Sequence, residues 1–194
     1  ERSAGCCSSM HHEEHVATHA DGGVQGSPRK IVRIVTRLNI GGPALHAATL
    51  STRLDPERFS TCLVVGEPGK AEGDWSGLVQ GPQARMVRVR ALRRSIHPLA
   101  DVVALWQLVR IVWQERPHII HTHMAKAGTL GRLSGMLYNR IGHGRTAGAR
   151  ARLIHTFHGH VLDGYFSAWL SGLFLSSERC LARHTDCRLA VSRT

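Results

Sequence analysis

Residues 30–66 read KIVRIVTRLNIGGPALHAATLSTRLDPERFSTCLVVG, and this stretch decides the fold. Its first part, residues 31–36, is short and rich in β-branched side chains, which predicts a strand. A glycine pair and a proline follow, and residues 43–53 then carry apolar side chains at helical spacing. Residues 61–66 are again short, apolar and β-branched. The order strand, helix, strand indicates two parallel strands joined by a crossover helix.

The same alternation continues along the chain. The sequence predicts further strands at 86–90, 118–121, 153–157 and 188–191, and further helices at 98–115, 126–138 and 166–183. Strands that alternate with helices form a parallel sheet covered on both faces. We therefore expect a doubly wound, Rossmann-like α/β domain. The Gly- and Arg-rich stretch 141–152 is expected to be an exposed basic loop.

The composition separates a tail from one folded domain. The chain has 194 residues, of which 42% are hydrophobic, so one domain with a buried core fits its length. Residues 1–29 are rich in Ser, His, Gly and Glu and have little apolar content, so we expect a disordered tail at 1–29 and the domain at 30–194. The tail carries four histidines that can bind a metal adventitiously: His11, His12, His15 and His19.

The folded part is strongly basic. The chain has 25 Lys and Arg against 14 Asp and Glu, and the tail holds two of the basic and four of the acidic residues, which leaves 23 against 10, or +13, beyond it. This excess predicts attraction to nucleic acid, to an anionic membrane surface or to a phosphorylated substrate. Nucleic-acid-binding proteins usually place aromatic side chains among their basic residues. The two Tyr and four Phe here lie mostly in apolar runs, which disfavours nucleic acid.

Cysteine usage and hydropathy indicate a cytoplasmic protein. The five cysteines are odd in number and show no CxxC spacing, so a disulfide framework is not expected and a reducing compartment is favoured. The N-terminus has no apolar signal segment, and no apolar run reaches about 18 residues, as a membrane-spanning helix would need.

The first candidate site is the turn Gly41-Gly42-Pro43, which follows the first strand and opens the first helix. Glycine lets a backbone approach a ligand closely, and proline suits the first helical position. Free N–H groups and the helix dipole at such a turn favour a phosphate group. A plain tight turn explains the motif equally well, and the dinucleotide pattern GxGxxG is absent.

The second candidate site follows the fourth strand. Strand geometry places His121 and His123 on one face of the sheet. Lys126 lies in the first turn of the next helix, where a cation opposes the helix dipole, so an anionic partner is expected there. The small residues of that helix, among them Gly131 and Gly135, predict close packing on the sheet.

The third candidate site, at the end of the fifth strand, contains His158 and His160. These residues could form a metal site with the histidines of the fourth strand, but no carboxylate or cysteine is near in sequence. Polar or acid–base contact with a substrate is the favoured interpretation, and no metal ligand is assigned. A basic run, RVRALRRS at 88–95, is either a solvated face or a contact for an anionic acceptor or lipid headgroups.

Together these motifs resemble one known family. The segments TRLNIGGPALH (36–46), RPHIIHTHMAKAGTLGRLSG (116–135) and HTFHGHVLDGYFS (155–167), with the pair Glu178-Arg179 and the string AVS, are similar to the N-terminal domain of family-4 retaining glycosyltransferases of the GT-B fold. The resemblance implies two Rossmann-like domains that face a cleft. The first binds the acceptor, a polysaccharide or a lipid-linked glycan, and the second binds a nucleotide sugar without a required metal or other cofactor.

The resemblance also implies roles for particular residues. Gly41 and Gly42 match the loop that faces the donor diphosphate, and His158 matches the histidine that lies against the transferred sugar. Further matches line the cleft or contact the acceptor: His123, Lys126, Arg94 and His160. The donor-binding domain, with its paired glutamates, is expected to be missing from this chain. We therefore expect a hexosyltransferase half that is inactive alone, peripheral on the inner face of the plasma membrane.

Two other interpretations stay open. A nucleotide-sugar epimerase of the same two-domain fold would need catalytic carboxylates in this cleft, and few are present. A basic module that binds nucleic acid or anionic lipid would use the charge of the folded part, and steeply salt-dependent binding would support it.

Overall fold

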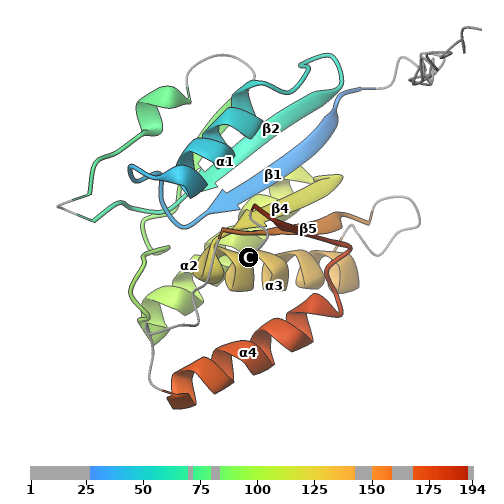
Figure 1. The fold of residues 1–194 in the computed structure, drawn as a ribbon. Helices are drawn as coiled ribbons and strands as arrows, with labels where there is room; N and C mark the ends of the chain where they lie inside the picture. The colour runs from blue at the N-terminus through green and yellow to red at the C-terminus, as the bar shows by residue number, and fades with distance from the viewer. Residues whose placement is uncertain (1–26, 70–71, 80–83, 143–149, 159–167, 192–194) are drawn as a thin grey trace, which may run out of the picture.

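The structure is a computed structural model that describes residues 27–69, 72–79, 84–142, 150–158 and 168–191. These residues form a six-stranded parallel sheet with the strand order β3-β2-β1-β4-β5-β6 (Figure 1). Its strands are β1 Arg29–Val35, β2 Phe59–Val65, β3 Ala84–Arg88, β4 Ile119–His123, β5 Arg152–Phe157 and β6 Cys187–Ala190. The chain starts at β1 in the middle, proceeds to β3 at one edge, and then returns to β4 on the other side of β1. The expected doubly wound α/β fold is confirmed.

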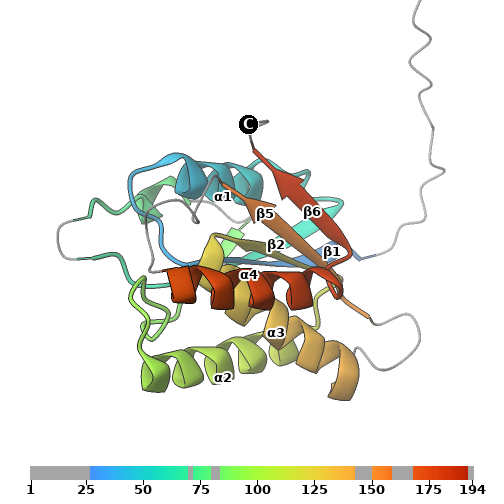
Figure 2. The same ribbon diagram turned by 60° about the horizontal axis from the view of Figure 1, so that its bottom comes forward.

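Helices cover the two faces of the sheet unequally. The helices are α1 Gly42–Thr52, the short 3₁₀ helix η1 Ser76–Leu78, α2 Pro98–Glu115, α3 Ala125–Ile141 and α4 Ala168–Ala182. Figure 2 shows α1 on one face, and α2, α3 and α4 on the other. Crossovers between parallel strands are right-handed. The connection from β1 to β2 runs toward one edge of the sheet and those from β3 to β6 run toward the other, so their helices lie on opposite faces of the sheet.

The core lies on both sides of the sheet. On the α1 face, Leu63 and Val65 of β2 pack with the three alanines of α1, Ala44, Ala47 and Ala48. On the other face, Val64 belongs to a cluster with Leu108 of α2 and strand residues from β1, β4 and β5. Adjacent residues of β2 therefore pack into two cores, which is why residues 62–65 of this strand form a continuous apolar run and do not alternate with polar residues.

The helix α3 packs closely on the sheet, as its small residues predict. A Cβ at Gly131 would lie 2.6 Å from Cγ2 of Thr122, and one at Gly135 would lie 2.5 Å from Cδ2 of Leu153. Side chains at these positions would push the helix away from β4 and β5. This close approach brings the start of α3 to the carboxyl ends of the central strands.

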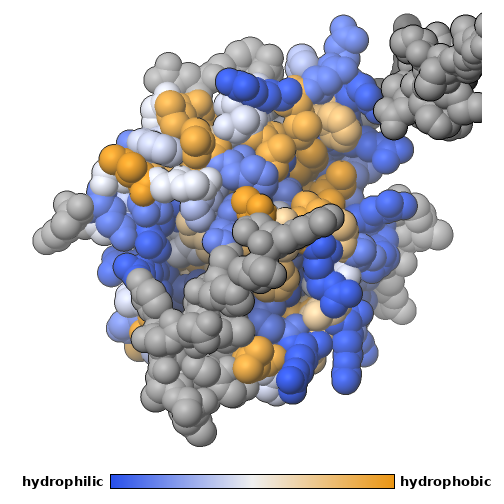
Figure 3. Space-filling view, viewed as in Figure 1, coloured by the Kyte–Doolittle hydropathy of each residue, from blue (hydrophilic) through white to orange (hydrophobic). Residues whose placement is uncertain are grey.

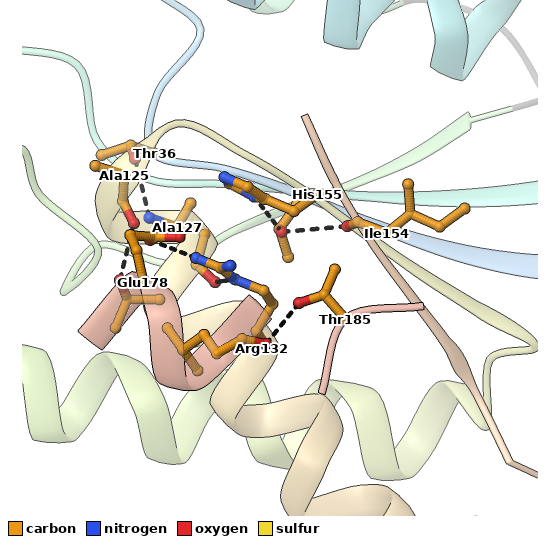
Figure 4. A network of polar contacts seen from close by, with 12 residues as sticks. Thr36, Ala125, Ala127, Arg132, Ile154, His155, Glu178 and Thr185 are labelled. Carbon is orange, nitrogen blue, oxygen red and sulfur yellow. Dashed lines mark hydrogen bonds and ion pairs between the residues drawn. The ribbon is translucent and has the colours of Figure 1, made fainter. Parts of the chain in front are cut away.

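Polar contacts fix α3 in place (Figure 4). The Thr36 hydroxyl, just after β1, accepts a 3.3 Å hydrogen bond from the N–H of Ala127. Arg132 is buried, and its Nε donates to the Gly128 carbonyl at 2.8 Å while Nη2 lies 2.5 Å from Oε1 of Glu178. The glutamate of the Glu178-Arg179 pair thus ties α4 to α3.

The expected elements are present, with shifts at their ends. The bounds of α2 are as predicted, but β4 continues to His123, two residues beyond the expected end, because His121 and His123 both stay in register with β5. The strand β1 begins at Arg29, which was expected to lie in the tail. Residues 1–26 lie outside the described residues, so the disordered tail stays a prediction. Most of the predicted basic loop, residues 143–149, lies outside them as well.

The surface is mixed in polarity. On the face in Figure 3, hydrophobic side chains occur in groups between hydrophilic ones. Among the described residues, no helix combines the length and the apolar character needed to cross a bilayer.

Candidate functional site

Three predicted site segments meet at the carboxyl edge of the sheet. The glycine turn follows β1, His123 ends β4, and His158 follows β5. The strand order reverses between β1 and β4, and in open α/β sheets ligands bind at the carboxyl side of such a switch point. Geometry therefore points to this edge as the binding site.

The glycine turn leaves open space at the start of α1. Gly41 precedes the helix with extended backbone, and no side chain caps the first turn. Among the described residues, a Cβ at Gly42 would meet nothing within 4 Å, and one at Gly41 would have its nearest neighbours at 3.9 Å. Packing against these residues thus does not require glycine here. The N–H groups of the first turn have no side-chain cap, as in helix starts that bind anions.

Three histidines from distant segments lie against one another beside this turn. Nδ1 of His123 is 3.0 Å from Nε2 of His158, so one ring donates a hydrogen bond to the other. His46, one turn into α1, has its ring centre 5.7 Å from that of His123 and 5.4 Å from that of His158. His158 is therefore next to the helix that the glycine turn opens. His123 is fully buried, whereas His46 and His158 are half-buried.

A buried polar row continues beneath the cluster on the α1 face. Nη1 of Arg33 in β1 is 2.7 Å from Nδ1 of His121, and Nε2 of His121 is 2.8 Å from the hydroxyl of Thr156. Nη2 of Arg33 donates to the Leu50 carbonyl of α1 at 3.3 Å. The rings of His121 and His123 lie 4.3 Å apart, which confirms that they share one face.

Burial keeps these imidazoles neutral. Burial, followed by the charge of Arg33, lowers the pKa of His121 to about 3, and burial with the neighbouring His46 lowers the pKa of His158 to about 4. The pKa of His123 is shifted in the same direction, mainly by burial. Burial also lowers the pKa of Arg33 to about 10, which leaves it charged at neutral pH. At pH 7 the cluster thus offers neutral donors and lone pairs rather than cations.

Lys126 has an anionic partner within the chain. Its Nζ lies 2.5 Å from Oδ1 of Asp101 in α2 and also donates to the carbonyl of Ser95. This ion pair ties the first turn of α3 to the start of α2. It accounts for a cation at a helix N-terminus without an external anion.

The structure describes one of the two remaining predicted cleft residues, Arg94, and not the other, His160. Arg94 is exposed in the segment that follows β3, next to Ser95, whose carbonyl Lys126 contacts. His160 lies outside the described residues. Sequence reasoning missed Arg33 and His46. His46 could have been found, because it lies four residues after Gly42 and thus on the same side of the helix. Arg33 is a lone charge in an apolar strand, which is itself a signal.

The fold and the position of this site define a class of protein. A parallel sheet of order 3-2-1-4-5-6 with polar groups at its switch point is a Rossmann-like domain, and it matches one half of enzymes with the two-domain GT-B fold. The chain belongs to the family described as the glycosyl transferase 4-like domain, which matches residues 41–194.

Solved structures share the fold at low sequence identity. MurG from Acinetobacter baumannii matches with a TM-score of 0.56 and 10% identity, over 86% of this chain and 42% of that one. A protein described as a UDP-N-acetylglucosamine 2-epimerase from Listeria monocytogenes matches with a TM-score of 0.54 and 11% identity, over 85% of this chain and 40% of that one. Sucrose-phosphate synthase from Thermosynechococcus elongatus matches with a TM-score of 0.54 and 15% identity, over 82% of this chain and 42% of that one. No curated protein sequence matches. The chain spans about two-fifths of the length of these structures, and the likeness establishes the fold alone.

Proposed function

We propose that this chain is the acceptor-side half of a retaining glycosyltransferase of the hexosyltransferase type, which transfers a sugar from a nucleotide-sugar donor. The observation that carries this proposal is the juxtaposition of an open glycine turn and a neutral histidine, His158, at the switch point of the sheet. Family membership makes it a glycosyltransferase domain. The donor, the acceptor and the stereochemistry are part of the proposal.

The glycine turn is proposed to bind the donor diphosphate. The leaving group of the transfer is a nucleoside diphosphate, whose negative charge increases as the glycosidic bond breaks. Uncapped N–H groups at the start of α1, together with the helix dipole, stabilise such a charge. Because no described residue occupies the place of a Gly42 side chain, phosphate oxygens can approach the backbone there. Further cations are expected from the second domain.

His158 is proposed to orient the transferred sugar. A neutral imidazole can accept from one sugar hydroxyl or donate to it, and His123 holds the ring through the 3.0 Å contact. The lowered pKa means that His158 is neutral at pH 7. In this proposal the transfer requires no metal cofactor. His123, through His158, is a positioning residue.

The acceptor side is proposed to lie along β3 and α2. Four arginines at the end of β3 and just after it are exposed: Arg88, Arg90, Arg93 and Arg94. In α2, Leu99, Val102 and Trp106 are 77%, 67% and 60% exposed. Exposed basic side chains in one segment and exposed apolar ones in the helix that follows it suit a lipid-linked acceptor at an anionic membrane surface. We propose peripheral attachment of a cytoplasmic protein. Sedimentation with liposomes that does not depend on anionic lipid content would count against it.

The donor contacts can be tested by NMR on the chain itself. We would titrate ¹⁵N-labelled protein with UDP, UDP-glucose, UDP-N-acetylglucosamine and GDP-mannose, and expect the largest amide shifts at Gly41 and Gly42. His158→Gln should weaken the binding of a nucleotide sugar but leave that of UDP unchanged, because His158 contacts the sugar. His118→Gln is the matched control, since His118 precedes β4 at the opposite edge of the sheet. Shifts that spare the glycine turn with every donor would refute the assignment.

Turnover and product analysis separate the remaining alternatives. The purified chain is expected to show little or no transfer, because it covers only 40–42% of the length of the structures it matches. Measurable transfer by the chain alone would contradict this expectation. Conversion of the donor sugar into its epimer without an acceptor would instead favour an epimerase.

A further inference from the structure

The histidine cluster has the geometry of a metal site. One ligand nitrogen from each of His46, His123 and His158 lies within 4.8 Å of the other two. The three ring centres are 5.3, 5.4 and 5.7 Å apart. The three residues come from α1, β4 and the segment after β5, so the arrangement is made by the tertiary fold and not by a local HxH pattern.

These separations are close to those around a tetrahedral ion. With Zn–N bonds of about 2.1 Å, two ligand nitrogens lie about 3.4 Å apart and their ring centres about 5.2 Å apart. Nδ1 of His123 and Nε2 of His158 are 3.0 Å apart, so this pair needs to spread by about 0.4 Å. His46 needs to move inward by at most about 1.4 Å, starting from the 4.8 Å limit. A half-buried side chain at the start of a helix can make that movement by rotation.

The state of the rings also suits a metal. Within the described part of the chain, Nδ1 of His46 and Nε2 of His123 are buried without a hydrogen-bond partner. Buried polar atoms left in this way are costly, and coordination can satisfy one of them.

The charge of Arg33 opposes a cation at this place. Its guanidinium contacts His121, which separates it from the cluster by one ring. Repulsion between charges falls with distance and with the effective dielectric constant, whereas the metal–nitrogen bonds are direct. An ion here is therefore bound more weakly than in a site with carboxylate or thiolate ligands. Imidazole ligands select Zn²⁺ and its first-row neighbours over Mg²⁺ and Ca²⁺.

We propose that His46, His123 and His158 bind one Zn²⁺ ion, with the fourth position of the tetrahedron open at the carboxyl edge of the sheet. An ion at this place takes the lone pair of Nε2 of His158, replaces the contact with His123 and leaves Nδ1 of His158 as a donor only, so it restricts the sugar contact and is not a cofactor of the transfer. That consequence rests on the proposed function, whereas the binding itself does not.

Binding can be measured with Co²⁺, whose visible spectrum distinguishes tetrahedral coordination. The histidines and cysteines of the tail and the two exposed cysteines are first replaced to give a background variant with these substitutions: H11Q, H12Q, H15Q, H19Q, C6S, C7S, C180S and C187S. We expect one Co²⁺ per chain with tetrahedral ligand-field bands, displaced by one equivalent of Zn²⁺. His46→Ala and His158→Ala in this background should each weaken binding at least tenfold, about 1.4 kcal/mol, and abolish the bands.

A matched control and a second variant make the result decisive. His97→Ala changes an exposed histidine at the start of α2 and should leave the Co²⁺ spectrum intact. His46→Gln removes the ring but keeps a polar side chain, and it replaces His46→Ala if circular dichroism shows that the alanine variant does not fold. Absence of tetrahedral bands in the background variant, or their survival in a folded His46 variant, would overturn the proposal.

Discussion

Acidification from pH 7 to pH 5 should destabilise this protein sharply, because its sheet buries neutral histidines. His121 is 6% exposed and His155 is 1% exposed, and burial lowers the pKa of each to about 3. In the unfolded chain a histidine titrates near pH 6.5, so the unfolded state binds protons first as the pH falls. Stability is therefore complete above pH 6.5, decreases below it, and stops decreasing near pH 3 for these two residues.

The magnitude follows from the difference between the two pKa values. Between pH 6.5 and pH 5 each of these two histidines lowers the free energy of unfolding by about 1.4 kcal/mol per pH unit. Over this range the loss is about 2 kcal/mol for each residue. His121 and His155 together remove about 4 kcal/mol at pH 5, and His123 acts in the same direction. The free energy of unfolding of a domain is about 5–15 kcal/mol, so this loss is a large part of its stability.

The assay is urea unfolding followed by circular dichroism at pH 7 and pH 5. The midpoint should fall while the slope m stays the same, because the exposed surface does not change. His155→Asn removes one titrating group, so the difference between the two pH values should shrink by about 2 kcal/mol. Thr122→Val is the matched control: it removes the hydroxyl 2.8 Å from Nδ1 of His155 and leaves the pH difference unchanged. A loss below about 1 kcal/mol in the parent protein would refute the reasoning.

Three substitutions test the packing around the site by urea unfolding at pH 7. Gly131→Ala places a Cβ 2.6 Å from Thr122 and should cost about 1–2 kcal/mol, even though alanine favours helix; an unchanged midpoint would show that α3 can shift freely. Glu178→Ala leaves the guanidinium of Arg132 buried without its carboxylate and should cost about 3–5 kcal/mol, whereas a loss under 1 kcal/mol would mean that water replaces the carboxylate. Gly42→Ala should change the free energy of unfolding by at most about 0.5 kcal/mol, because no atom of the described residues occupies the place of its Cβ; a larger loss would contradict the open turn.

The order of the helices and strands and the class of fold could be predicted from the sequence alone. The helix α2 was predicted with its observed bounds, because Pro98 opens it and apolar residues recur at helical spacing. The strands were recognised from short β-branched runs, and their alternation with helices indicated a parallel sheet. These features depend on backbone sterics and on contacts a few residues apart, so they are present in any short window of the chain. The motifs around the glycine turn and the histidines also identified the family.

Only the tertiary structure decided which side chains meet. His46 and His158 are 112 positions apart, and they touch because the sheet order puts the ends of β4 and β5 beside the helix that follows β1. Lys126 of α3 forms an ion pair with Asp101 of α2, and no local sequence pattern indicates this contact. Such contacts depend on strand order and on the register of parallel pairs. Strand order and register are both set by how the helices pack against the two faces of the sheet, and that packing involves contacts between residues from all parts of the chain.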